Sequence, residues 1–82
     1  MEPAVAFGRV LRRLRIDAGL TQEGLGFDAE PRRIFISLLE LGQQQPSRTT
    51  IFKLAKPLNT NPKGIVGLVE VEMQQASRRR TA

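Results

Sequence analysis

The residues with the most chemical potential lie between positions 32 and 41, where the sequence predicts a short helix. Ile36 and Leu39, three residues apart, are the expected core pair, with Phe35 beside them. The open side of this helix then carries cationic and apolar groups together: Arg32, Arg33, Ile34, Ser37, Leu38 and Leu41. An exposed apolar patch usually marks a contact surface, so the chemistry expected here is binding.

The rest of the sequence offers little to a catalyst. It contains no cysteine and no histidine, so most nucleophilic, acid–base and zinc chemistry lacks its usual residues. The eight carboxylates form no evident site. We therefore predict that the protein is not an enzyme and holds no metal or cofactor. The missing cysteines also fit a reducing cytoplasm.

The charge of the chain is positive and unevenly spread. There are 13 Lys+Arg against 8 Asp+Glu, for a net charge of +5 and a pI of about 11.1. Such a balance suggests either a polyanionic partner or simple solubility. No acidic residue lies between Leu41 and Val69, whereas this span holds Arg48, Lys53, Lys56 and Lys63. That unevenness favours a polyanionic partner. No apolar run approaches the roughly 18–20 residues that span a bilayer, so we expect no membrane segment.

Helices are also predicted on the N-terminal side of this stretch. From Pro3 to Ala18 the apolar residues recur at helical spacing, and Gly19 is a natural stop; the stripe comprises Phe7, Val10, Leu11, Leu14 and Ala18. Arg9, Arg12 and Arg13 should face water. Arg15, at the edge of the stripe, either is solvated or reaches inward to a carboxylate. A second, short helix should begin after the N-cap Thr21.

A tight turn is expected at Ala29–Pro31, and the following helix should run from Arg32 to Leu41 and stop at Gly42. Inward positions for Phe27 and Ala29 are expected before it. Ser47 should cap a fourth helix that carries Ile51, Leu54, Ala55 and Leu58, and that ends early or kinks because of Pro57. Pro62 should start the last helix, with one side formed by Ile65, Leu68, Val69 and Glu72, and an adjoining side by Val66 and Met73.

The chain is long enough for one small domain. We assign residues 1–77 to it and residues 78–82 to a basic C-terminal tail that we expect to be disordered.

Two short helices joined by a few residues match the outline of a helix-turn-helix, whose second helix lies in the DNA major groove. The ordered motifs Leu11-x-x-Leu14-Arg15, Gly19-Leu20-Thr21-Gln22-Glu23-x-Leu25, Ile36-Ser37-x-Leu39-Glu40-x-Gly42 and Pro46-Ser47 resemble the Xre/Cro-type family of phage and bacterial repressors. The resemblance runs from about Phe7 to Val69. It implies an all-α, compact five-helix lambda-repressor-like domain, with the helix-turn-helix at helices 2 and 3.

The resemblance also implies roles for individual residues. Thr21 and Gln22 match phosphate-contacting positions, and Arg48 and Lys53 are further candidates for the DNA phosphates. The base-reading positions are Arg32, Arg33, Ile34, Ser37 and Leu38. Arginine can bind the O6 and N7 of guanine bidentately, and an apolar tip can contact a thymine methyl. Arg15 and Glu40 match an ion pair between the first and third helices of the family.

Five positions depart from the family pattern. Glu30 replaces a glycine that often needs positive φ, and Arg32 replaces a helix-capping residue. Pro31, Leu41 and Pro57 also differ from the usual residues. These departures affect the expected stability and the placement of the recognition helix rather than the fold.

We therefore expect a sequence-specific regulator of transcription, acting as a repressor in a bacterial or phage cytoplasm. A monomer of this size makes few contacts, so a homodimer that binds double-stranded DNA is expected. The expected dimer interface is formed by Ile65, Val66, Val69 and Met73. The alternative is a protein-binding module, such as the antitoxin of a toxin–antitoxin pair, with Ile34, Leu38 and Leu41 buried in the partner. Controller proteins of restriction–modification systems are also short, single-domain members of the family.

Overall fold

A computed structural model describes residues 1–26 and 33–81, with side chains as far as Arg78. These residues form five helices and no strand: α1 (Pro3–Asp17), α2 (Gln22–Leu25), α3 (Arg33–Glu40), α4 (Arg48–Ala55) and α5 (Pro62–Thr81). The all-α fold expected from the sequence is confirmed. The turn predicted at Ala29–Pro31, and the inward positions predicted for Phe27 and Ala29, lie outside the described residues.

Local side chains set the starts of two helices as predicted. The hydroxyl oxygen of Thr21 accepts a hydrogen bond from the Gly24 amide at 2.9 Å, which caps α2. The hydroxyl oxygen of Ser47 accepts one from the Thr50 amide at 3.1 Å, which caps α4. Each bond satisfies one of the amide groups that a helix start leaves without a partner.

Glycine and proline set the helix ends. Gly19 and Gly42 adopt positive φ, at +72° and +75°, after α1 and α3. The Gly42 amide donates to the Leu39 carbonyl at 3.1 Å, as in the common glycine stop of an α-helix. α4 ends at Ala55, two residues before Pro57, because proline has no N–H and crowds the preceding turn.

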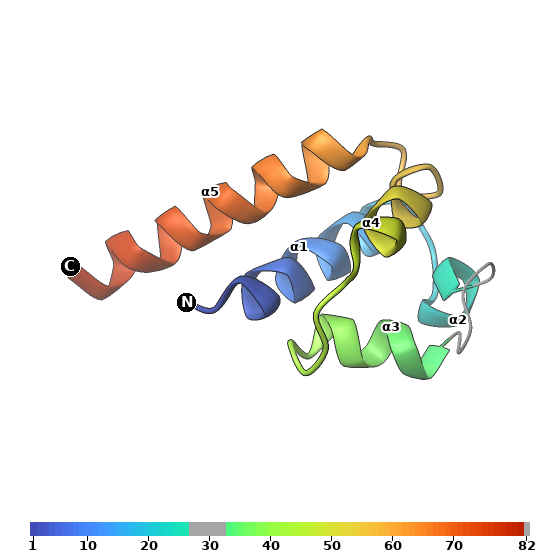
Figure 1. Cartoon of the computed structure of the whole chain (residues 1–82), viewed down its shortest axis with the longest axis horizontal. Helices are drawn as coiled ribbons and strands as arrows, with labels where there is room; N and C mark the ends of the chain where they lie inside the picture. Colours follow the sequence, from blue (N-terminus) through green and yellow to red (C-terminus); the bar gives the residue numbers. More distant parts are fainter. Residues whose placement is uncertain (27–32, 82) are drawn as a thin grey trace.

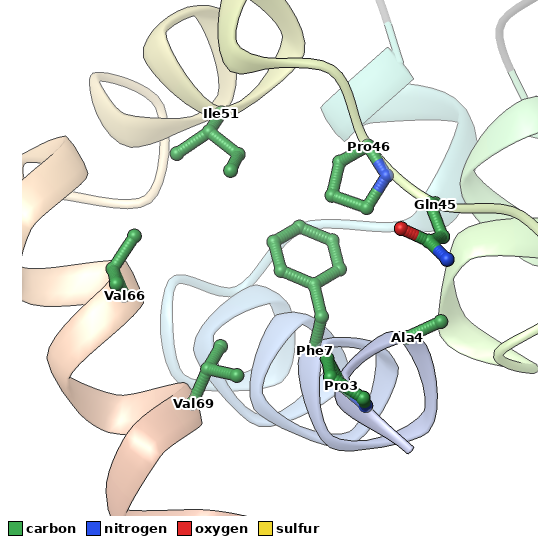
Figure 2. A pocket seen from close by; sticks show the side chains of 8 residues that line it. All are labelled: Pro3, Ala4, Phe7, Gln45, Pro46, Ile51, Val66 and Val69. Atoms are coloured by element: carbon green, nitrogen blue, oxygen red, sulfur yellow. The ribbon is translucent and has the colours of Figure 1, made fainter.

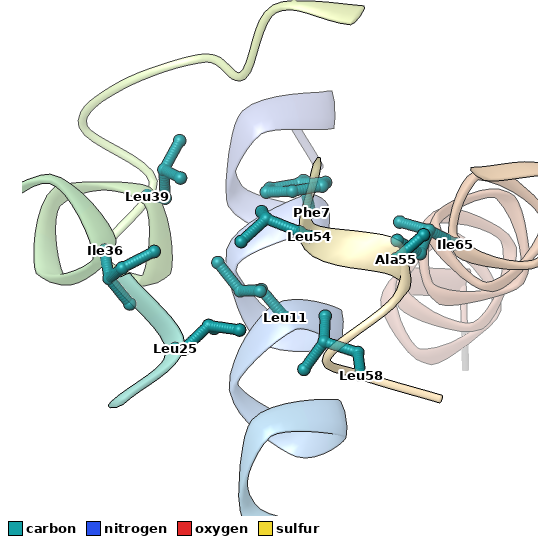
Figure 3. Close-up of a cluster of buried hydrophobic side chains, with 9 residues drawn as sticks. All are labelled: Phe7, Leu11, Leu25, Ile36, Leu39, Leu54, Ala55, Leu58 and Ile65. Carbon is teal, nitrogen blue, oxygen red and sulfur yellow. The ribbon is translucent and has the colours of Figure 1, made fainter. Parts of the chain in front are cut away.

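α1 occupies the middle of the molecule, with α3 on one side and α5 on the other (Figure 1). Figure 3 shows side chains of α1 between two groups of apolar residues, from α2 and α3 on one side and from α4 and α5 on the other. The buried cluster comprises Phe7, Leu11, Leu25, Ile36, Leu39, Leu54, Ala55, Leu58 and Ile65. The helix-turn-helix and the α4–α5 pair therefore both pack against α1.

The C-terminal tail corrects a prediction. Residues 78–81 were expected to be disordered, but α5 continues to Thr81. No glycine or proline follows Gly67, and the intervening glutamate, methionine, glutamine, alanine and arginine residues have good helix propensity. Among the helices of the described residues, none is both long and apolar enough to cross a lipid bilayer.

Candidate nucleic-acid interface

α3 has one buried side and one exposed side, as expected from the sequence. Ile36 and Leu39 are completely buried, and Phe35 packs partly buried against the same core. The opposite side exposes Arg33 and Ile34, the latter to 68%. Ser37 and Leu38 are half-buried at its margin, and Leu41 is exposed just beyond the helix. Arg32 lies outside the described residues.

A bidentate ion pair holds the C-terminal end of α3 against α1. The Nε and Nη2 groups of Arg15 donate to the two carboxylate oxygens of Glu40, at 2.6 and 3.2 Å. The side chains are only 13% and 5% exposed. The inward position considered for Arg15 is therefore the one observed. A buried pair of this kind fixes geometry, because removing one partner leaves an uncompensated charge in the interior.

The same pair extends to the α1–α2 connection. Nη1 of Arg15 donates to the Leu20 carbonyl at 2.9 Å, and the Gln22 amide donates to Glu40 at 3.1 Å. Gln22 thereby links the first residue of α2 to the last residue of α3. One guanidinium and one carboxylate thus join α1, α2, α3 and the loop before α2.

The pKa of Arg15 lies above its ordinary value, mainly because its guanidinium donates hydrogen bonds to Glu40. Burial of the guanidinium lowers the pKa, and the negative charge of Glu40 raises it further. A raised pKa means that the stabilisation is complete below the ordinary value and is lost only as pH rises through the raised one. Arg15 therefore stays charged at any physiological pH, and its contact with Glu40 is not a pH switch on the alkaline side.

Gly8 allows α1 and α3 to approach closely at the same place. A Cβ atom added to Gly8 would lie 2.5 Å from the Leu39 carbonyl oxygen and 2.6 Å from that of Glu40. Both obstacles are backbone atoms, so a side chain at Gly8 would require α3 to move. Gly42 makes a second close contact, since its Cβ would lie 2.9 Å from Val5 Cγ2. Neither contact can be predicted from the sequence, because both depend on the separation between two segments that are distant in the chain.

A second ion cluster joins α1 to α5. The carboxylate of Glu72 is 4% exposed and accepts a hydrogen bond from Arg13 at 2.9 Å. Arg9 lies 3.5 Å from the other carboxylate oxygen. Arg9 and Arg13 were expected only to face water; they are more than half exposed but also carry this contact. The sequence contained one indication of this contact: Glu72 lies on the same side of its helix as Ile65, so its carboxylate faces α1.

The residues predicted to contact DNA phosphates lie at the start of α2 and on α4. Thr21 is exposed and Gln22 is half-buried at the start of α2. Arg48 and Lys53 are both exposed on α4, but they are five residues apart and so point about 140° away from each other around the helix. Arg48 borders a pocket with Phe52 and Lys63, between α4 and α5.

Only part of the predicted dimer surface is available for contact. Ile65 is 1% exposed and belongs to the core of its own chain, so the prediction that it lies in an interface is wrong. It sits one helical position away from Val66, which is 55% exposed. Val66, Val69 and Met73 line a shallow groove along α5.

Comparison with known proteins identifies the family. A family model described as a helix-turn-helix domain matches residues 6–64, which include all of α2, α3 and α4. The chain belongs to the helix-turn-helix family. Its similarity to known controller proteins places it among the Xre-type regulators, whose motifs it shares.

Three similar proteins are informative. The chain is 30% identical over 66 residues to the control protein C.BamHI of Bacillus amyloliquefaciens, across 79% of this chain and 82% of that protein. It is 39% identical to the restriction-modification controller protein C.AhdI of Aeromonas hydrophila, with a TM-score of 0.70 over 76% of this chain and 90% of that one. The clp gene regulator ClgR of Corynebacterium glutamicum shares the fold at 21% identity, with a TM-score of 0.85 over 99% of this chain and 87% of that one.

Family membership gives the helices their roles. In this helix-turn-helix, α2 is the supporting helix and α3 is the recognition helix. The family consists of transcriptional regulators rather than enzymes, as the composition predicted. The brace formed by Arg15, Gln22 and Glu40 therefore holds the recognition helix at both its supporting helix and α1.

Proposed function

We propose that this protein is a regulator of transcription that binds double-stranded DNA sequence-specifically as a homodimer, with α3 in the major groove. The observation that carries the proposal is the two-sided nature of α3. Ile36 and Leu39 are completely buried, while Arg33 and Ile34 project from the other side. A recognition helix needs this combination, since it must be fixed from behind and open in front.

The exposed side chains suit the edges of base pairs. Arg33 can donate two hydrogen bonds to the O6 and N7 of guanine. Ile34 and Leu38 can contact thymine methyl groups, and the Ser37 hydroxyl can bond to several bases. Arg32 precedes this helix in the sequence and is proposed to contribute a second cation. The proposal therefore predicts a half-site that contains both guanine and thymine.

Contacts to phosphate would fix the position of α3. The Thr21 oxygen already accepts the Gly24 amide, which leaves its hydroxyl hydrogen available for a phosphate oxygen. The Gln22 amide has two N–H groups and uses one of them on Glu40. Arg48 and Lys53 would add charge from α4. Such contacts set register but carry no sequence information.

Dimerisation would place two recognition helices on successive turns of DNA, about 34–36 Å apart. We assign the interface to the apolar surface shared by α4 and α5. Val66, Val69 and Met73 supply its α5 side. α5 lies across α1 from α3 (Figure 1), so joining two copies through the α5 side would leave both recognition helices open.

The class of regulated genes can be proposed from the similar proteins. C.AhdI is a restriction-modification controller protein, and C.BamHI is a control protein. Both matches cover more than three quarters of this chain. We therefore propose that this protein also controls the genes of a restriction-modification system, and that it represses transcription when its binding site overlaps a promoter. An antitoxin-like role would instead bury Ile34 and Leu41, which are 68% and 63% exposed, in a protein partner. Copurification of a stoichiometric partner without DNA would favour that alternative.

Two variants test the proposed function by separating base readout from charge. Binding of selected and random duplexes is measured by gel shift at several salt concentrations. Arg33→Ala should reduce discrimination between the duplexes by about 1–3 kcal/mol, and Lys53→Ala should weaken binding to both alike and lower the salt dependence. Binding by the unmodified protein without any sequence preference would overturn the proposal.

A further inference from the structure

A small apolar pocket opens on the surface that α4 and α5 share. It has a volume of about 180 Å³. Figure 2 shows the Phe7 ring at its centre, rising from α1 toward the α4 side, with α5 side chains beside it. The main lining residues are Ala4, Phe7, Pro46, Ile51, Val66 and Val69. These six residues are all apolar, and Gln45 at the margin is the one polar lining residue within the described ranges, so water entering the pocket would find few polar partners.

The side chain that matches this pocket lies next to it on the same surface. Phe52 is 67% exposed on α4 and is the only exposed aromatic side chain among the described residues. It follows Ile51, which lines the pocket, but successive helical residues point about 100° apart. Phe52 accordingly does not line the pocket of its own chain and borders a neighbouring one instead.

We propose that, in the homodimer, Phe52 of each copy inserts into the pocket of the other. An apolar cavity of about 150 Å³ is enough to hold benzene, so this pocket can take a phenyl ring. A projection and a matching hollow on one surface can satisfy each other twice around a two-fold axis, as an isologous interface requires. The inference rests on the proposed dimer and adds the contact that holds it together.

The surroundings of the two features are complementary as well. Arg48 and Lys63 border the hollow beside Phe52, whereas Glu70 lies beside Val66 and Val69. When Phe52 enters the pocket of the second copy, its basic neighbours approach the acidic neighbour of that pocket. Val66 lines the pocket, the groove along α5 and the hollow beside Phe52. The contact surface is therefore continuous, and a second copy fits it better than an isolated small molecule does.

The test measures the dimer dissociation constant by sedimentation equilibrium for three variants of the full chain. Phe52→Ala removes the projection and should weaken the dimer roughly 30-fold, the loss typical of a central interface aromatic. Ala4→Leu fills the pocket from its own chain and should weaken it comparably. Val71→Ala, at an exposed α5 position outside the pockets, is the control and should leave the constant unchanged. Circular dichroism of each variant verifies that α-helical structure is retained.

A photo-crosslinking residue gives an independent readout. Phe52→benzoylphenylalanine should couple, between copies, to peptides that contain Ala4, Phe7 or Pro46. A dimer that is unaffected by Phe52→Ala and crosslinks elsewhere would overturn the inference while leaving a dimeric regulator. Binding of added benzene to the pocket, without any change in the dimer dissociation constant, would also overturn the inference. A chain that remains monomeric without DNA would overturn both the inference and the proposed dimer, while sequence-specific half-site binding would keep the rest of the proposed function.

Discussion

The two sides of α1 are held in different ways. Toward α3, Arg15 and Glu40 form a bidentate pair with both side chains largely buried, and Gly8 admits the α3 backbone at close range. Toward α5, only the carboxylate of Glu72 is buried, and Arg9 and Arg13 are more than half exposed. Both contacts join an arginine to a glutamate across two helices, but they differ in the burial of the arginine.

This difference matches the tasks proposed for the two sides. A recognition helix must be fixed closely, because a small displacement misplaces every contact to the bases. The α4–α5 side presents a pocket and an exposed phenylalanine, which would become packed in the proposed dimer. The closest and most buried contacts thus hold the helix that would bind DNA, whereas the exposed apolar surface lies where a second copy of the protein would bind.

Removing the buried carboxylate should have the largest effect. Glu40→Ala leaves the Arg15 charge in the interior without its partner, so we expect a loss of about 3–5 kcal/mol in the free energy of unfolding. Chemical denaturation followed by circular dichroism measures it. The double variant Arg15→Met, Glu40→Leu should recover most of the loss, because no charge is then left buried. A loss below about 1 kcal/mol, the value of an exposed pair, would contradict the assigned burial.

Adding one carbon at the closest helix contact should come next. Gly8→Ala places a methyl group against the Leu39 and Glu40 carbonyls, and overpacking of this kind costs about 1–3 kcal/mol. Because α3 must move, the discrimination between selected and random duplexes should fall as well. Gly67→Ala is the matched control, since its Cβ meets nothing within 4 Å; it should stabilise α5 by up to about 1 kcal/mol. Equal effects of both substitutions would show that α3 does not depend on this contact.

The N-cap of α2 should have a smaller effect on stability and a separate one on binding. Thr21→Ala removes the bond to the Gly24 amide, at a cost of about 1 kcal/mol. Asn61→Ala provides the comparison, because Asn61 caps α5 by accepting the Gly64 amide at 2.7 Å. Both variants should lose similar stability in thermal denaturation, but only Thr21→Ala should also weaken DNA binding. If both weaken it equally, Thr21 has no phosphate contact of its own.

The ion cluster between α1 and α5 should give the smallest loss, because its two arginines are exposed although its carboxylate is buried. Glu72→Gln keeps the shape of the side chain and a hydrogen-bond acceptor, and Arg9 and Arg13 can turn to water, so we expect a cost of about 0.2–1 kcal/mol. Denaturation in low and high salt measures it, and salt should reduce the difference between variant and parent. A loss as large as that of Glu40→Ala would remove the contrast between the two sides of α1.

Local features of the structure could be predicted from the sequence, because their causes are local. The caps at Thr21 and Ser47 and the stops at Gly19 and Gly42 depend on residues a few positions away. The core pair of α3 followed from helical periodicity, and the family motifs indicated how Arg15 would be placed.

Features that depend on how two helices meet could not be predicted in this way. The space at Gly8, the cluster around Glu72 and the burial of Ile65 all require the distance and rotation between α1 and another helix. The helical end of α5 differs from the expected tail for another reason: its basic composition is also typical of a solvated segment, but its residues are good helix formers.

Selection of bound sequences from a random duplex pool tests the central claim most directly, namely that the exposed face of α3 reads DNA in pairs. The proposal predicts enrichment of two equivalent half-sites in inverted orientation, with centres about 34–36 Å apart, and a weaker preference for guanine within each half-site with Arg33→Ala. A pool that remains random after repeated selection, while the protein stays folded, would contradict it.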